Sequence, residues 1–503
     1  MNELPEEFKT IADGIQESKQ NQVKMPVVVK GETPLGELKV SLRAFRDEQL
    51  ARLQEAAQEK NKRAPNALTP YHCSTLLNKY IQFCLYDKKE GTKLAMYQPE
   101  EGIYTQNEDV IRRVISWLEP SLDQRKAGTV IYHLKNMAEF KSKTVSRFLI
   151  PVKNGIFNVK TKQLEPFSVD YVFTAKIATP YVENPKLPNI EGWNVDKWLH
   201  DLASGEADTE LLLWQVISAS MNGNYSRKKS IWLFSDGNTG KGTYQQLIMN
   251  LVGIDNVATL KLPQFSEKFA LPMLEEKVVC IGDDVPSNVN IDDSSNFNSV
   301  VTADYVPVEQ KGKPKYTVQF NMTIIQSTNG LPKIHNKSEG TYKRFLIIEF
   351  KKQFLGDDDN WRIKGEYIKR QDVLEYVLHK AINIDFEQFI NPVSSQQLLE
   401  SYKVDNDPVQ EFKQEVFDKF TSVRLPVSYV YACYEAFCET SGYKPLGSRK
   451  FISSLERILG KDWKKDRQRP AELFHEDFFP SGYTGINKYE TAVCFINTRL
   501  EAV

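Results

Sequence analysis

The spacing of apolar and polar residues changes several times along the chain. Residues 44–63 mix both signs of charge at helical spacing, which predicts an exposed, salt-bridged helix. Alternating residues predict a hairpin over 94–106 and a second over 147–168, the latter with Asn154-Gly155 as its turn. Helices are predicted over 111–120 and within 194–221, with a proline-containing loop over 180–193 between them.

Between residues 230 and 350 the pattern becomes one of short apolar runs alternating with a helical segment. Strands are predicted over 229–235, 277–284, 322–329 and 345–350, and a helix over 243–253. Residues 306–310 and 315–320 alternate with period two around a lysine-rich turn. Such a pattern predicts a parallel α/β core with an inserted hairpin.

In the last part of the chain, the pattern predicts a linker over 391–408, followed by helices and then short strands. Residues 424–460 form two helical segments joined by a turn, with Ser448 as the expected N-cap of the second. The basic run 462–470 follows, and two short strands are expected after it.

With 503 residues the chain exceeds what one hydrophobic core usually supports. We expect an accessory region at 1–92, a mixed α+β and helical domain at 93–215, the α/β core at 216–390, the linker at 391–408 and a terminal domain at 409–503. The predicted fold class is α/β. Hydrophobic residues at 41% and charged residues at 26% are typical of a soluble globular protein.

No apolar run is long enough to cross a bilayer, and MNELPEEFKT lacks the pattern of a signal peptide. We therefore expect a cytoplasmic protein with no membrane partner. The six cysteines are scattered without a C-x-x-C pair, so reduced buried thiols are expected and no zinc site. The net charge of −1 argues mildly against a dedicated DNA-binding protein, but residues 441–470 hold nine Lys or Arg against three Asp or Glu.

A glycine-rich turn between the first strand of the core and its helix is the strongest chemical signal. In SDGNTGKGT, Gly237 and Gly240 let the backbone approach a phosphate closely, and Lys241 can reach the β- and γ-phosphates. The predicted nucleotide-binding residues are Gly237, Asn238, Thr239, Gly240, Lys241, Gly242 and Thr243. The alternative is a glycine-rich turn between strand and helix with an incidental lysine; the strand before it and the helix after it favour phosphate binding.

This motif departs from the usual P-loop at two positions. Ser235 stands where the first glycine is usual, and Gly242 replaces the Ser or Thr whose hydroxyl binds Mg²⁺. Thr243 and Asp283 are the candidate Mg²⁺ ligands. The substitution weakens the assignment of the metal ligand more than that of the phosphate site.

Polar residues at the ends of two later strands complete the candidate ATP site. Asp283 would hold Mg²⁺ and Asp284 would polarise the attacking water, while Asn329 would orient it. Lys343 and Arg344 precede the last strand of the core. Taken singly these residues are equally typical of strand ends, turns and surface charge; their order after the P-loop favours the functional interpretation.

The order of these motifs resembles superfamily 3 helicases of the AAA+ class, in the poxvirus- and phage-type primase–helicase family. The resemblance rests on residues 149–181, on the ATPase motifs and on VTADYVPVEQKGKPKYTVQF, which is similar to the DNA-translocating hairpin of that family. It implies a homo-hexameric ring around single-stranded DNA, 3′-to-5′ translocation, ATP and Mg²⁺ as cofactors, and a phage, plasmid or genomic island in a bacterial host as the source.

The resemblance also implies particular roles for basic residues. Arg344 would be the finger that reaches the γ-phosphate of a neighbouring subunit, although Lys343 stands where the family often has a second arginine. Lys311, Lys313 and Lys315 at the hairpin tip would contact DNA phosphates; a solvated tip is the alternative. The N-terminal 92 residues show no clustered carboxylates for priming, so we expect no primer synthesis.

The terminal domain has the layout of a winged helix that binds duplex DNA. Its predicted DNA-binding residues are Arg449, Lys450, Lys464, Lys465 and Arg467. A protein-interaction domain with a solvated basic face is the alternative. The predicted function is an ATP-dependent ring-forming replicative helicase, with origin binding as an added role. The alternatives are an origin-recognition initiator without processive unwinding and a P-loop phosphotransferase.

Overall fold

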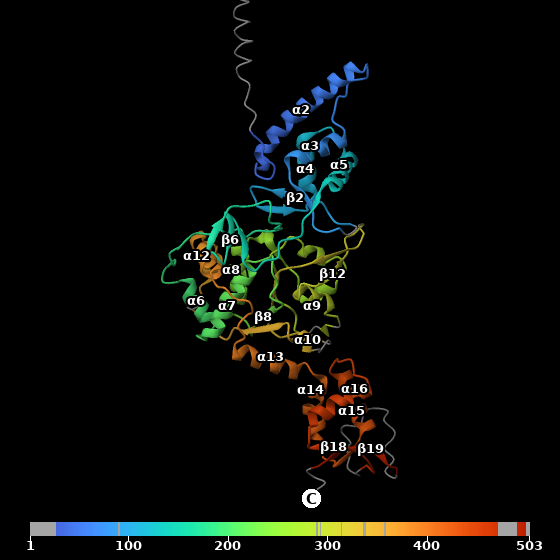
Figure 1. Cartoon of the computed structure of the whole chain (residues 1–503). Helices are drawn as coiled ribbons and strands as arrows, with labels where there is room; N and C mark the ends of the chain where they lie inside the picture. The colour runs from blue at the N-terminus through green and yellow to red at the C-terminus, as the bar shows by residue number, and fades with distance from the viewer. Residues whose placement is uncertain are drawn as a thin grey trace, which may run out of the picture.

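In the computed structural model the described residues are 27–88, 91–287, 290–291, 293–312, 314–334, 339–356, 359–470 and 490–498 (Figure 1). Within them the N-terminal part combines four helices with a small sheet in the order β3-β2-β1-β4. The helices are α2 (Leu35–Glu59), α3 (Pro70–Tyr80), α4 (Glu108–Leu118) and α5 (Gln124–Met137). The strands are β1 (Phe83–Leu85), β2 (Ala95–Gln98), β3 (Ile103–Thr105) and β4 (Glu139–Phe140). The predicted 44–63 helix begins nine residues earlier, at Leu35, and the hairpin predicted over 94–106 is β2–β3.

A three-stranded meander and two helices connect this part to the core. The strands are β5 (Leu149–Val152), β6 (Gly155–Asn158) and β7 (Gln163–Glu165), so the hairpin predicted over 147–168 gains a third strand. Helices α6 (Val195–Leu202) and α7 (Ala207–Ser220) follow, as predicted. The side chains of the meander and of both helices pack into the same hydrophobic core as one face of the central sheet.

The central sheet is five-stranded and parallel, in the order β16-β8-β14-β10-β9. Its strands are β8 (Ser230–Phe234), β9 (Val257–Ala258), β10 (Val279–Gly282), β14 (Thr323–Thr328) and β16 (Phe345–Glu349). Ile231 and Leu233 face the core formed with α6, α7 and α8 (Lys241–Val252), whereas Trp232 between them faces a second core. Because both faces are covered, the strands are buried along almost their whole length and do not alternate between a buried and an exposed face.

Shorter elements surround this sheet. They are the 3₁₀ turns η1 (Ile254–Asn256), η2 (Leu262–Ser266), η3 (Leu271–Leu274) and η5 (Tyr367–Lys369), helices α9 (Ser295–Val301), α10 (Glu339–Tyr342), α11 (Trp361–Gly365) and α12 (Gln371–Ile382), and strands β11 (Asn290–Ile291) and β15 (Lys333–Ile334). The inserted hairpin is present as β12 (Tyr305–Val308) paired antiparallel with β13 (Tyr316–Gln319). Val306 and Val308 are buried against the second core, as their period-two spacing predicted.

The segment predicted as a linker, 391–408, contains helix α13 (Val393–Asp405). The Tyr402 side chain on this helix is buried, donates a hydrogen bond to the Pro332 carbonyl oxygen at 2.5 Å and stacks on Phe345 of β16. Helix α13 therefore packs on the central core before the chain enters the last part of the molecule (Figure 1).

The terminal part has its own core and a sheet in the order β17-β19-β18. Its elements are α14 (Pro408–Glu415), η6 (Phe417–Lys419), β17 (Arg424–Pro426), α15 (Val427–Thr440), α16 (Ser448–Leu459), β18 (Trp463–Gln468) and β19 (Ala492–Asn497). Two details of the structure differ from the sequence predictions. Gly447, not Ser448, is the N-cap of α16 and there is no side-chain cap; the basic run predicted to precede the strands is itself strand β18.

All six cysteines lie within the described residues, are buried and form no disulfide, as predicted. Among the described residues, no helix combines the length and the apolar character that a bilayer span requires.

Candidate nucleotide-binding site

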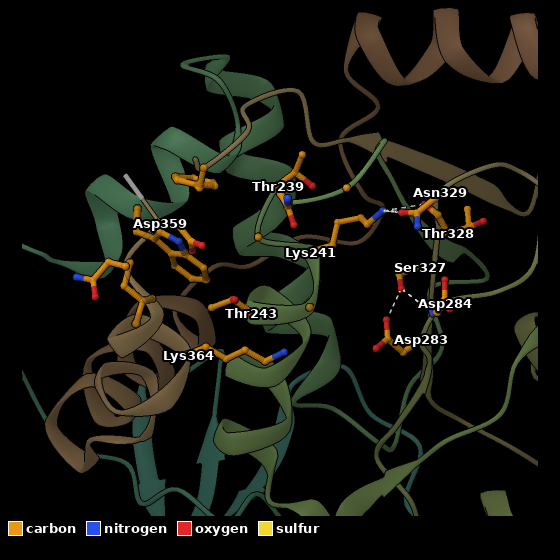
Figure 2. A pocket seen from close by; sticks show the side chains of 18 residues that line it. Thr239, Lys241, Thr243, Asp283, Asp284, Ser327, Thr328, Asn329, Asp359 and Lys364 are labelled. Atoms are coloured by element: carbon orange, nitrogen blue, oxygen red, sulfur yellow. Dashed lines mark hydrogen bonds between the residues drawn. The ribbon is translucent and has the colours of Figure 1, made fainter. Parts of the chain in front are cut away.

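A pocket of about 460 Å³ lies at the carboxyl edge of the central sheet (Figure 2). Strands β8, β10 and β14 run parallel, so the residues that follow them meet at this edge. The structure brings Lys241, Asp283, Asp284 and Asn329 together there. The other predicted residues that line the pocket are Gly237, Asn238, Thr239, Gly240, Gly242 and Thr243. Its volume is within the usual range for sites that bind small ligands and cofactors.

The glycine-rich turn has the backbone conformation of a concave anion-binding loop. Gly237, Asn238 and Gly240 have φ values of +116°, +52° and +82°, and glycine and asparagine are the residues that tolerate the left-handed region best. Gly240 caps α8 without a side-chain hydrogen bond. The first N–H groups of α8 therefore remain available to an anionic ligand.

Ser235, which replaces the usual first glycine, braces this turn. Its hydroxyl oxygen accepts hydrogen bonds from the Gly237 N–H at 3.3 Å and from the Thr239 hydroxyl at 2.7 Å. A residue outside the turn also contacts it: the Phe354 N–H donates a hydrogen bond to the Asn238 carbonyl oxygen at 2.9 Å. The departure from the common motif thus adds hydrogen bonds that hold the loop in shape.

Lys241 contacts the residues that follow β8 and end β14. Its ammonium donates hydrogen bonds to the carbonyl oxygens of Ser235 and Thr328 at 3.0 and 2.9 Å and to Asn329 Oδ1 at 2.6 Å. Burial lowers the pKa of this ammonium, and the nearby carboxylates, Asp283 foremost, oppose that shift. The lysine is therefore held at the sheet edge with its charge beside the acidic pair.

Both acidic residues are exposed to the pocket and are positioned by Ser327, a buried residue at the end of β14. The Ser327 hydroxyl donates to Asp283 Oδ1 at 2.6 Å, and its oxygen accepts the Asp284 N–H at 3.1 Å. Asp284 has φ of +50°, and its carbonyl oxygen accepts from Lys261 Nζ at 3.0 Å. Sequence reasoning missed Ser327, although the polar residues Gln326, Ser327 and Thr328 at the end of a buried strand were a signal.

The far wall of the pocket was also missed. It comes from α6 and from the segment after β16, and its residues are Trp198, Phe354, Asp359, Asn360, Ile363 and Lys364. No sequence motif joins these positions. Figure 2 shows Lys364 reaching from α11 toward the beginning of α8, where Thr243 lies.

Lys343 and Arg344 are not brought to this pocket. Phe345 pairs with Ser230 in the parallel β16–β8 ladder, so both basic residues lie at the amino edge of the sheet. A five-residue strand is roughly 16 Å long, which separates them from the P-loop of their own chain. The Arg344 guanidinium donates to the Gly340 carbonyl oxygen, and its buried Nε has no partner among the described residues.

The predicted DNA-contacting residues lie on two separate surfaces. Lys311 and Lys315 are exposed at the hairpin tip; Lys313 is outside the described residues. Lys315 forms an ion pair with Glu309 and holds the pKa of that carboxyl below its usual value. The sequence analysis predicted exposed lysines at the tip but not this ion pair. Glu309 precedes the turn and Lys315 follows it, so only the folded turn brings the two side chains together.

In the terminal part, the predicted basic residues of α16 and β18 are exposed. They are Arg449, Lys450, Lys464, Lys465 and Arg467. Lys465 Nζ lies 2.5 Å from a carboxylate oxygen of Glu456 on α16. One of the five charges is thus partly neutralised within the chain.

Three protein-family models match successive segments of the chain. Residues 50–201 match "D5 N terminal like", residues 233–344 match a family of unknown function (DUF5906), and residues 404–485 match "Poxvirus D5 protein-like". The two D5 matches flank the segment that contains the glycine-rich turn.

Solved structures of the NrS-1 C-terminal region are also similar to this chain. The A form apo structure is 11% identical, covers 86% of this chain and 100% of its own, and has a TM-score of 0.46. A second apo structure of the same region is 12% identical, covers 85% and 99%, and has a TM-score of 0.45.

Gly240→Ala tests the loop geometry. A Cβ at this position would lie 2.8 Å from Leu202 Cδ2 at a backbone φ of +82°, so we expect a loss of about 1–2 kcal/mol in unfolding free energy together with weaker ATP binding. Gly442→Ala is the matched control, because Gly442 has φ of +73° and open space around it. Calorimetric ATP titrations and urea denaturation measure both effects. Wild-type ATP affinity in Gly240→Ala would contradict the assigned loop.

Proposed function

We propose that this protein is an ATP-driven DNA motor, a ring-forming replicative helicase built on a superfamily 3 AAA+ core. The observation that supports it best is the single pocket in which the P-loop, Lys241, the acidic pair and Asn329 meet. A lysine-tipped hairpin is inserted in the same core, between the acidic strand β10 and β14. The matches to D5-like models on both sides of that core agree with this proposal.

In this proposal, the chain's own groups bind and orient the triphosphate. The N–H groups of residues 237–243 and the Lys241 ammonium hold the β- and γ-phosphates. To bind them, the Lys241 ammonium gives up its hydrogen bonds to the carbonyl oxygens of Ser235 and Thr328. Asp284 polarises the attacking water, and Asn329 orients it. Ser327 holds the Asp283 carboxylate and the Asp284 backbone through its two hydrogen bonds.

The oxygen groups in the pocket fit Mg²⁺. Asp283 and the Thr243 hydroxyl would hold the ion, which supplies charge neutralisation on the phosphates. The described residues contain no group of three or more His, Cys, Asp or Glu that could hold a metal by itself. An ion that is bound through one or two carboxylates and the substrate's own phosphates needs no such cage.

The two edges of the sheet favour an assembly in which each ATP site is completed by a neighbour. The pocket opens at the carboxyl edge, and Arg344 lies at the amino edge, about a strand length away. A guanidinium there can reach a phosphate only in another subunit. The family resemblance implies that this assembly is a homo-hexamer and that it moves along DNA in the 3′-to-5′ direction.

DNA would contact two surfaces with different tasks. Exposed lysines at the hairpin tip would grip the backbone of the strand in the pore without reading its sequence. Lys311 is the sharper candidate, because Lys315 is already paired with Glu309. The basic residues of α16 and β18 would bind duplex DNA in a winged-helix manner. The alternative is an initiator that binds origins without unwinding DNA. It would have the same ATP pocket and DNA-binding surfaces, but its ATP turnover would not be coupled to movement along DNA.

Two substitutions test the ATP site. Lys241→Ala removes phosphate charge and should reduce ATP hydrolysis by about a thousandfold or more, without loss of folding. Asp284→Asn should keep ATP binding and stop turnover. Hydrolysis assays with a circular-dichroism check of folding measure both. Near wild-type hydrolysis in either variant would refute the assignment.

Mixing experiments test the neighbouring finger. Arg344→Ala alone should hydrolyse ATP on the order of a thousandfold more slowly. Mixed with Lys241→Ala subunits, it should regain part of the activity, because some interfaces then combine an intact P-loop with an intact finger. Lys343→Ala is the control that separates the two adjacent basic residues. Zero activity at every mixing ratio would exclude a site shared between subunits.

A further inference from the structure

Gly242 leaves a space in the P-loop that most P-loops fill. The usual Ser or Thr at this position places a hydroxyl beside the phosphates and Mg²⁺. Here a Cβ at residue 242 would lie 3.5 Å from the ammonium nitrogen of Lys364. A hydroxyl-bearing side chain would therefore extend toward the place where the Lys364 ammonium lies (Figure 2).

Lys364 comes to this place from α11, which several contacts fix. The Asn360 side chain caps the helix by accepting the Arg362 N–H at 3.1 Å. The Arg362 guanidinium binds Glu191 at 2.6 Å and Glu366 at 3.1 Å, and Ile363 packs on the main core. Because these contacts hold both ends of the short helix, the stem of Lys364 is directed into the pocket.

The Lys364 ammonium differs from the lysines just before it in the chain. Lys351 pairs with Glu206 at 2.9 Å and Lys352 with Asp201 at 3.2 Å. Within the part of the chain that the structure describes, no carboxylate forms an ion pair with Lys364, although Asp283, Asp284 and Asp359 line the same pocket. Its charge is directed at the ligand space.

We propose that Lys364 is a second phosphate-binding lysine, which places a positive charge on the side of the loop where Gly242 leaves space. This inference rests on the proposed nucleotide site and names a residue outside all three matched segments. Lys241 points toward Asn329 at the end of β14, and Lys364 points toward the beginning of α8 from the side of α11 (Figure 2). A lysine is a compact point charge, so it binds a phosphate oxygen without the geometric demands of arginine. Gly242 leaves the space beside that ammonium open.

The test compares how tightly the full-length protein binds ADP and AMP, by calorimetric titration in EDTA, so that only the protein's own charges act. Lys364→Met should weaken ADP binding about tenfold and AMP binding less, because the effect of a phosphate contact grows with phosphate charge. Lys364→Arg should recover part of the loss. Lys369→Met is the matched control, because Lys369 is exposed on the next turn and does not line the pocket.

The outcomes separate this inference from the proposed function. If Lys241→Ala loses ADP binding and Lys364→Met binds ADP like Lys369→Met, only the role of Lys364 is overturned. Equal losses for ADP and AMP would also overturn it, since the lysine would then act on the nucleoside. If the wild-type protein binds no ADP, with or without Mg²⁺, the proposed function itself fails.

Discussion

The register of three parallel strands is the constraint on which the candidate site depends. Phe234 pairs with Thr328, and Gly282 pairs with Gln326, so β8, β14 and β10 end at one edge of the sheet. A shift of one residue would turn every side chain to the other face, and would move Ser327 away from Asp283. Burial of both faces enforces the register, since Trp232 and its neighbours Ile231 and Leu233 fill different cores.

The same sheet separates the groups of the proposed ATP site. Parallel strands deliver the P-loop and acidic pair to one edge and Arg344 to the other, and a single chain cannot bring these edges together. Association of identical subunits, edge to edge, would do so. The ATP pocket and the hairpin are joined through the core as well: β12 and β13 pack on the residues that cover β10 and β14.

Much of this arrangement could be predicted from local pattern. Continuous apolar runs identified β8, β10, β14 and β16, and the glycine-rich turn identified the P-loop, because these features depend on neighbouring residues. Contacts between distant segments could not be predicted. The brace from Ser327 to Asp283 spans two strands, and Lys364 reaches Gly242 from a helix about 120 residues further along the sequence.

Three smaller differences have physical causes of the same kind. Helix α13 occupies the predicted linker because Tyr402 finds a buried acceptor on the core, which the local sequence does not reveal. Gly447 caps α16 in place of Ser448, in line with the one- or two-residue uncertainty of helix ends. Lys315 is paired with Glu309 because the hairpin turn brings them together. The assignments of DNA contacts, ring formation and direction stay predictions.

The central claim is that ATP hydrolysis at this pocket moves DNA along the hairpin. Its most direct test measures ATP hydrolysis and fork unwinding in the same reaction, for the wild-type protein and for Lys311→Ala. The account predicts that forked DNA stimulates hydrolysis and is unwound by the wild type. Lys311→Ala should keep DNA-free hydrolysis and lose both stimulation and unwinding. Hydrolysis indifferent to DNA, with no unwinding by the wild-type protein, would contradict the account.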